Sequence, residues 1–142
     1  PIVPNGIMAM GRIWEASVRG YLEWEAAKEG LMSVSSLTLE WQDTIGNLDQ
    51  LFYGMNRRVV GETKLKFSGH TDPRENKRYM YQVKAYCYMA RALEAWMSVA
   101  AITTKPPDVD SRIFRLLFTQ EELDANWEML MNMKEHLEGG AA

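Results

Sequence analysis

The strongest local constraint on the fold is a helix start in residues 68–76, which read SGHTDPREN. Asp72 can cap the helix, Pro73 fits its first position, and Glu75 can bond back to the cap, which makes an Asp version of the capping box. Apolar residues at helical spacing after this start predict one long helix from residue 72 to about residue 101. The Pro-Pro pair within residues 103–110 must break that helix.

Helical spacing of apolar residues predicts four further helices, at residues 7–28, about 35–55, 113–118 and 119–137. Gly30 supplies a stop for the first of them, and Thr119 with Glu122 forms a second capping box. The clearest stripe lies in the second of them and contains Trp41, Ile45, Leu48, Phe52 and Met55.

Two segments depart from this helical pattern. Residues 1–6 (PIVPNG) hold two prolines and a glycine and predict an extended arm. Apolar and charged residues alternate over 63–67, which predicts a short strand or β-hairpin near 58–68. The sequence therefore predicts an all-α fold. We expect a single-domain bundle of about five helices over residues 7–142, with an arm at 1–6.

Composition limits the classes of protein and site. The chain has 142 residues, 46% of them hydrophobic and 25% charged, as in an ordinary globular domain. Cys87 is the single cysteine, so an intrachain disulfide is excluded, and with only His70 and His136 besides we expect no metal site. Cys87 falls on an apolar helix face, which predicts a buried, inert thiol. Without a membrane-spanning run or signal peptide, we expect an intracellular location or one within a virion.

Positive charge is concentrated in one band. Residues 57–91 contain nine Lys or Arg against three Asp or Glu, although the whole chain has a formal net charge of −3. Lys77, Lys84 and Arg91 recur at intervals of seven, and Tyr81 and Tyr88 lie between them, so a helix would place all five on one face. The candidate nucleic-acid-binding residues are Arg57, Arg58, Lys64, Lys66, Arg74, Lys77, Arg78, Tyr81, Lys84, Tyr88 and Arg91.

Two interpretations account for this basic band. A row of cations can contact successive phosphates of DNA or RNA, and tyrosines between them can stack on exposed bases, which gives salt-dependent, sequence-independent binding. Alternatively, the stripe is an ordinary solvated helix face, with Lys stems lying along the Tyr rings. Lys64 and Lys66 would then protect an edge strand from aggregation.

Catalytic motifs find little support in the sequence. A glycine-rich phosphate loop, a nucleophile elbow and a His-x-x-x-His pair are all absent, so we expect a non-enzymatic protein without a cofactor. Aromatic and Met residues near both ends exceed what narrow helix stripes can bury, which predicts self-association. These residues are Trp14, Tyr21, Trp24, Trp127, Met129, Met131 and Met133.

At the level of architecture, the chain resembles the helical coat or nucleocapsid subunits of filamentous viruses. The resemblance depends on the PIVPNG arm, the basic stripe and the surplus aromatic and Met residues. It implies a self-assembling structural protein that binds nucleic acid through the phosphate backbone and forms homo-oligomers or larger assemblies. The alternative is a helical protein–protein interaction module that docks an acidic partner.

Overall fold

The structure, a computed structural model, describes residues 5–66, 72–104 and 107–140. Within these ranges the fold is mixed α/β, with three α-helices and a five-stranded sheet. The elements in chain order are α1 (Asn5–Lys28), β1 (Met32–Trp41), β2 (Thr44–Tyr53), β3 (Arg58–Lys66), the 3₁₀ turn η1 (Pro73–Glu75), α2 (Lys77–Ala90), β4 (Glu94–Thr104), β5 (Pro107–Leu117) and α3 (Gln120–Gly140).

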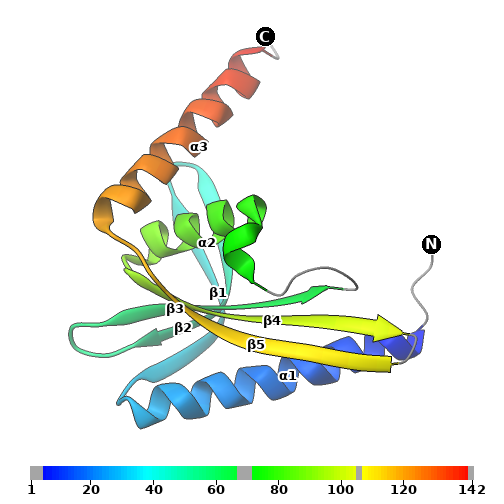
Figure 1. Cartoon of the computed structure of the whole chain (residues 1–142). Coiled ribbons are helices and arrows are strands. Elements are labelled where there is room, and N and C mark those ends of the chain that lie inside the picture. The colour runs from blue at the N-terminus through cyan, green and yellow to red at the C-terminus, as the bar shows by residue number, and fades with distance from the viewer. Residues whose placement is uncertain (1–4, 67–71, 105–106, 141–142) are drawn as a thin grey trace.

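The strands follow one another across the sheet in chain order, β1-β2-β3-β4-β5. All neighbouring pairs are antiparallel except β3 and β4, which are parallel and are joined through α2. Figure 1 shows α1 beneath the sheet, α2 above it, and α3 rising from the end of β5 away from the sheet. The central strand β3 is therefore covered by a helix on each face.

Two apolar cores lie on the two faces of the sheet. The core beneath α2 is formed by Leu48, Val60, Val83, Cys87, Ala90, Ala92, Ala95, Met97, Leu116 and Leu123. The core above α1 is formed by Val18, Leu22, Ala26, Leu31, Phe52, Val59 and Trp96. Cys87 is buried, as the sequence predicted. No helix in the described part of the chain is long and apolar enough to cross a membrane.

The predicted all-α fold is wrong, and the helix predicted at about 35–55 is the β1–β2 hairpin. The apolar residues whose spacing suggested a helix do not lie in one environment. Leu48 and Phe52 are buried, but Ile45 is 65% exposed and Met55 is fully exposed. The helical spacing was thus a coincidence of residues that belong to different strands and surfaces.

The long helix predicted for residues 72–101 is also wrong in its second half. Asp72 caps η1, Asn76 caps α2, and α2 ends at Ala90 because Arg91 takes a left-handed conformation. The following residues form β4, in which 95–101 are all buried. A strand covered on both faces lacks polar alternation, so its sequence cannot be told from a buried helix by periodicity.

Two other segments are strands of a sheet that the sequence analysis did not predict. The segment near 58–68 does contain a strand, β3, but it is the centre of the sheet and not part of a separate hairpin. The helix predicted at 113–118 is wrong, because these residues belong largely to β5, which pairs with β4 along its whole length.

The first and last helices are confirmed. α1 ends at Lys28, and Gly30 follows with a φ of 75°, the left-handed conformation that glycine adopts readily. At the start of α3 the Thr119 backbone amide donates to the Glu122 carboxylate at 2.8 Å, and the Glu122 amide donates to the Thr119 hydroxyl at 3.2 Å. Helix α1 begins at Asn5, and residues 1–4 of the predicted arm lie outside the described residues.

Candidate functional site

Two acidic residues lie close together where β2 separates from the central strand β3. The pairing of these strands ends at Gln50 and Gly61. Beyond that point the Thr63 amide donates to the Asp49 carboxylate at 2.9 Å, and the Asp49 backbone hydrogen-bonds to the Glu62 carboxylate. The end of the strand pairing thus brings Asp49 and Glu62 together at the middle of the sheet.

The Glu62 side chain is unusually costly to ionise. It is only 3% exposed, and burial raises its pKa to about 7, with a further upward contribution from the negative charge of Asp49. Lys64 opposes this shift, because its ammonium group lies 3.2 Å from the Glu62 carboxylate. A buried carboxyl group beside a second carboxylate is the kind of strained electrostatic arrangement that gathers at functional sites.

Helix α2 contributes the side chains that face this cluster. The Lys64 ammonium group donates to the side-chain oxygen of Gln82. The side-chain amide nitrogen of Gln82 donates to the Tyr86 hydroxyl at 3.0 Å. Burial raises the pKa of the Tyr86 phenol, and the charges of Glu62 and Asp49 raise it further. Gln82 and Tyr86 are one helical turn apart, so α2 presents both from the same face. We call Asp49, Glu62, Lys64, Gln82 and Tyr86 the acidic cluster.

Gly46 allows α2 to lie this close to β2. A Cβ atom at Gly46 would lie 3.0 Å from the Met89 sulfur and 3.2 Å from the Tyr86 ring. A larger residue at this position, three residues before Asp49, would require the Met89 or Tyr86 side chain to shift.

The two carboxyl groups of the acidic cluster are of the ligand type that a hard divalent cation prefers. Among the residues that the structure describes, no group of three or more His, Cys, Asp or Glu could hold a metal ion. Mg²⁺ does not need such a group, because it is usually bound by one or two carboxylates together with waters and substrate phosphates. Asp49 and Glu62 supply that pair. With Glu62 ionised, two negative charges would face one positive charge at Lys64, and a bound cation would balance the difference.

The predicted basic residues on β3 and directly before it have distinct partners. Lys64 belongs to the acidic cluster, and Lys66 lies 5.5 Å from the Tyr79 ring centre. Arg57 pairs with Glu94 at 2.9 Å and with Glu29 at 3.3 Å, and Arg58 donates to the Ala90 carbonyl. Arg57, directly before β3, is thus tied by ion pairs to the residue after α1 and to the first residue of β4.

The predicted stripe on α2 is divided between two surroundings. Lys77 and Arg78 are exposed in the first turn of α2, and Arg74 pairs with Asp72 just before it. The remaining members approach α3 and the strand before it. Tyr88 stacks on Trp127 with ring centres 4.5 Å apart, Lys84 lies 5.8 Å from the Phe118 ring centre, and the Tyr81 carbonyl accepts from Asn126. Arg91 is exposed beyond the helix end. Tyr88 is therefore already stacked within the protein.

Four members of the acidic cluster were missed by the sequence analysis. Asp49 was assigned to a helix, and Glu62 entered only the charge count of the basic band. Gln82 and Tyr86 could not be recognised from the sequence, because Lys64, which Gln82 contacts, is distant in the chain. The signal that could have found them is Glu62-Thr63-Lys64 within a strand, since alternation places Glu62 and Lys64 on one face.

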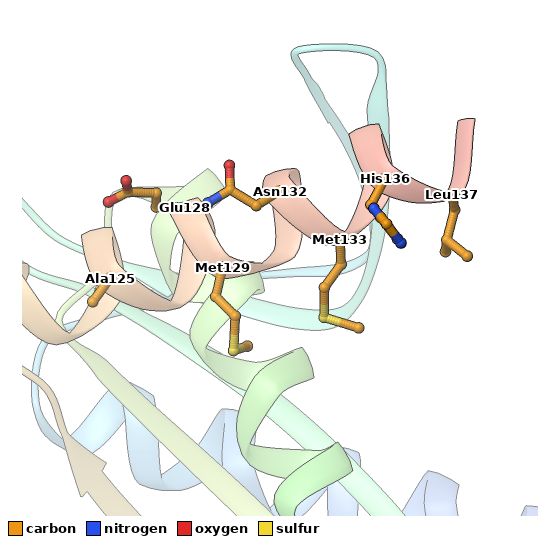
Figure 2. Close-up of a pocket in the computed structure, with 7 residues that line it drawn as sticks. All are labelled: Ala125, Glu128, Met129, Asn132, Met133, His136 and Leu137. Atoms are coloured by element: carbon orange, nitrogen blue, oxygen red, sulfur yellow. The ribbon is translucent and has the colours of Figure 1, made fainter. Parts of the chain in front are cut away.

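A separate hollow of about 640 Å³ runs along α3, and Figure 2 shows Met129, Met133 and Leu137 on its apolar side. All seven lining residues come from this one helix: Ala125, Glu128, Met129, Asn132, Met133, His136 and Leu137. None of them belongs to the acidic cluster. This hollow is thus an apolar helix face and not a site with convergent polar groups.

Comparison with known proteins supports the fold alone. No family model matches the chain, and no curated protein matches it in sequence. Among solved structures, the crystal structure of SSO0001 resembles it with a TM-score of 0.51 and 14% sequence identity. The match covers 92% of this chain but 62% of that chain, so this chain spans less than two thirds of the other protein's length.

Proposed function

We propose that the protein is a metal-dependent nuclease that hydrolyses phosphodiester bonds at the acidic cluster. The observation that carries this proposal is the position of Asp49 beside the Glu62–Lys64 ion pair. The Asp49 carboxylate accepts from the Thr63 amide, between Glu62 and Lys64, and the Asp49 backbone hydrogen-bonds to the Glu62 carboxylate. Paired carboxylates with an adjacent lysine suit phosphoryl chemistry, in which negative charge must be bound and stabilised.

The chain's own residues have separable roles in this proposal. Asp49 and Glu62 would hold a divalent cation such as Mg²⁺, which when bound supplies charge stabilisation to the phosphoryl group. Lys64 can donate to a phosphate oxygen or to the attacking water, because its flexible ammonium group has three donors. Gln82 fixes the position of Lys64, and Tyr86 in turn orients Gln82.

Nucleic acid is the substrate class that the surroundings favour. Lys77 and Arg78 are exposed in the first turn of α2, where the helix dipole favours negative charge. Cations there are unfavourable for the helix itself, which supports a role in binding phosphates. Binding through the phosphate backbone, expected from the sequence, is thus part of this proposal. A non-enzymatic, self-assembling coat-like subunit stays an untested prediction.

The test is cleavage of fluorescent single-stranded DNA, duplex DNA and single-stranded RNA with Mg²⁺, Mn²⁺ or EDTA. We expect cleavage with Mg²⁺ or Mn²⁺, none in EDTA, and a loss of about 100-fold or more in Asp49→Asn and Glu62→Gln. Glu40→Gln, which alters an exposed carboxylate on β1, should cleave as the parent does. Circular dichroism checks that each variant is folded.

Two results would overturn the proposal. One is a parent protein that binds these nucleic acids but cleaves none of them with either metal, which would favour the non-enzymatic interpretation. The other is cleavage by Glu62→Gln at the parent rate, which would place the chemistry elsewhere.

A further inference from the structure

A polar hollow lies where the end of β1, the end of α2 and the start of α3 meet. It has a volume of about 330 Å³. We call it the tip pocket, and it is lined by Trp41, Tyr88, Met89, Arg91, Gln120 and Asp124. Unlike the hollow along α3, it is built from three elements and combines aromatic, cationic and hydrogen-bonding side chains.

Backbone strain is concentrated around this pocket. Among the described residues, four that are not glycine have a positive φ. Gln42 and Asp43 directly follow Trp41, which lines the tip pocket, and form a two-residue turn with φ of 49° and 58°, where glycine or asparagine is usual. Arg91 lines the pocket with a φ of 55°. Strained backbone persists where the surrounding structure holds it, and it is common at binding sites.

Helix α3 holds the strained turn in place. The Trp127 indole donates to the Gln42 side-chain oxygen at 3.0 Å, and Lys134 donates to the Asp43 carbonyl at 3.1 Å. Trp127 also stacks on Tyr88, which lines the pocket. These contacts fix Trp41 beside Arg91 while the Trp41 side chain stays 47% exposed. An exposed indole fixed by strained backbone presents a ready stacking surface.

The pocket walls match the chemistry of a nucleobase. Trp41 offers a flat apolar face, and Arg91 offers a planar cation, both of which stack on bases. Gln120 and Asp124, joined by a hydrogen bond of 2.8 Å, provide donors and acceptors for a base edge. The aromatic ring can stack on the base of a nucleotide, and the adjacent guanidinium group can contact its phosphate.

The tip pocket and the acidic cluster are connected through α2. Met89 lines the pocket and contacts the Gly46 position, which also faces the Tyr86 ring. From Gln82 to Arg91 the chain rises by about 13 Å at 1.5 Å per residue. A strand with one base in the tip pocket could therefore place a phosphate a short distance along it near Asp49 and Glu62.

We propose that the tip pocket binds one unpaired nucleobase of the substrate strand, with Trp41 as the stacking platform and Arg91 as its cationic neighbour. This inference rests on the proposed nuclease function and names its substrate class as a strand with at least one unpaired base. A base paired within a duplex cannot enter the pocket unless it leaves the stack.

The experiment measures binding of fluorescein-labelled oligothymidylate to Glu62→Gln protein in EDTA, so that cleavage is suppressed. A series of oligonucleotides carries a single abasic residue at successive positions. With Trp41 intact, we expect an abasic residue at one position to weaken binding about tenfold, because base–aromatic stacking is lost. With Trp41→Ala added, that penalty should disappear, whereas Trp41→Phe should restore part of it.

Two further variants separate binding from stability. Trp24→Ala removes another exposed tryptophan, on α1, and should keep the full abasic penalty. Arg91→Gly relieves the positive φ, so it should raise the melting temperature while weakening oligonucleotide binding several-fold. A purely structural Arg91 would not give opposite changes in these two measurements.

Two results would overturn the tip-pocket proposal. One is a loss of affinity on abasic substitution that is the same in folded Trp41→Ala as in the protein with Trp41. The other is a loss of affinity that is equal at all positions of the abasic residue. This failure is distinct from failure of the nuclease. A parent protein that cleaves with Mg²⁺ but shows no penalty that depends on Trp41 retains the nuclease alone. A penalty that depends on Trp41, without any cleavage by the parent, supports the base-binding pocket but contradicts the nuclease.

Discussion

The Glu62 carboxylate lies 3.2 Å from the Lys64 ammonium group, yet the pKa of Glu62 is still raised to about 7. Burial is the largest cause, and the neighbouring charge of Asp49 adds to it. The ion pair with Lys64 therefore does not offset the cost of ionising Glu62 in the folded protein. If the proposed cation binds here, its positive charge would lower the cost of ionising Glu62.

The first prediction concerns stability against pH in EDTA. The Glu62 carboxyl has an ordinary pKa of 4.5 and a folded pKa of about 7. The favourable contribution of the protonated group is full below about pH 4.5 and is lost as the pH rises to about 7. The ionisation of Glu62 should therefore lower the free energy of unfolding of the parent by about 3 kcal/mol across this pH window. Glu62→Gln should lack that loss.

Urea unfolding of both proteins from about pH 4.5 to pH 8 measures this difference. Glu40→Gln serves as the matched control, because Glu40 is exposed on β1. Parallel pH profiles for the parent and Glu62→Gln would contradict the raised pKa.

The same residues show what the sequence could and could not predict. Capping chemistry is local, so Thr119 with Glu122 correctly predicted the start of α3. The acidic cluster is not local. Asp49 and Glu62 are thirteen positions apart and become neighbours only because β2 and β3 pair and then separate. Once β2 was interpreted as a helix, this juxtaposition could not be predicted.

The fold class failed for a related physical reason. In β4 the residues from Ala95 to Ala101 are all buried, so the strand shows no alternation that would distinguish it from a helix. The end of α2 has no glycine signal either, because Arg91 takes the left-handed conformation there. Of the basic residues predicted to bind nucleic acid, Lys64 is the one that lies in the acidic cluster.

The second prediction concerns Gln82, which positions Lys64 without being a substrate-contacting group itself. Gln82→Leu removes the acceptor of the Lys64 hydrogen bond and the donor to Tyr86. We expect kcat for cleavage to fall about 10- to 100-fold with KM nearly unchanged, since groups that orient active-site residues have effects of this size. Steady-state kinetics on a fluorescent oligonucleotide checks this. Asn132→Leu on α3 is the control, and a rise in KM with constant kcat would contradict a positioning role.

The third prediction compares two glycines. A Cβ atom at Gly61 would lie 2.9 Å from the Phe52 ring and 3.0 Å from the Gln50 Cβ, so Gly61→Ala forces the core above α1 apart. We expect a loss of about 1–3 kcal/mol in the free energy of unfolding. Gly20 lies within α1 with nothing within 4 Å of its Cβ position, so Gly20→Ala should stabilise by about 0.5–1 kcal/mol. Equal unfolding midpoints in urea for the two variants would count against this packing.

The fourth prediction assigns phosphate contacts to the first turn of α2. Lys77 and Arg78 are exposed there, where the helix dipole disfavours cations, so replacing both with Ala should not weaken the helix. Each phosphate contact contributes about 0.9 to the slope of log affinity against log salt on duplex DNA and about 0.7 on single strands. The double variant should therefore bind a single-stranded oligonucleotide more weakly and with a slope smaller by about 1.4.

Fluorescence anisotropy across a salt series, with Glu62→Gln protein in EDTA, measures this slope. Arg12→Ala with Arg19→Ala removes the same charge from α1, which packs on the opposite face of the sheet, and it separates a local contact from a general effect of net charge. If both double variants lower the slope of log affinity against log salt equally, the effect comes from the overall positive charge of the protein. The first turn of α2 would then have no special role in binding. If only the α2 variant lowers the slope, the strand passes over the first turn of α2, beside Lys64 and the acidic cluster.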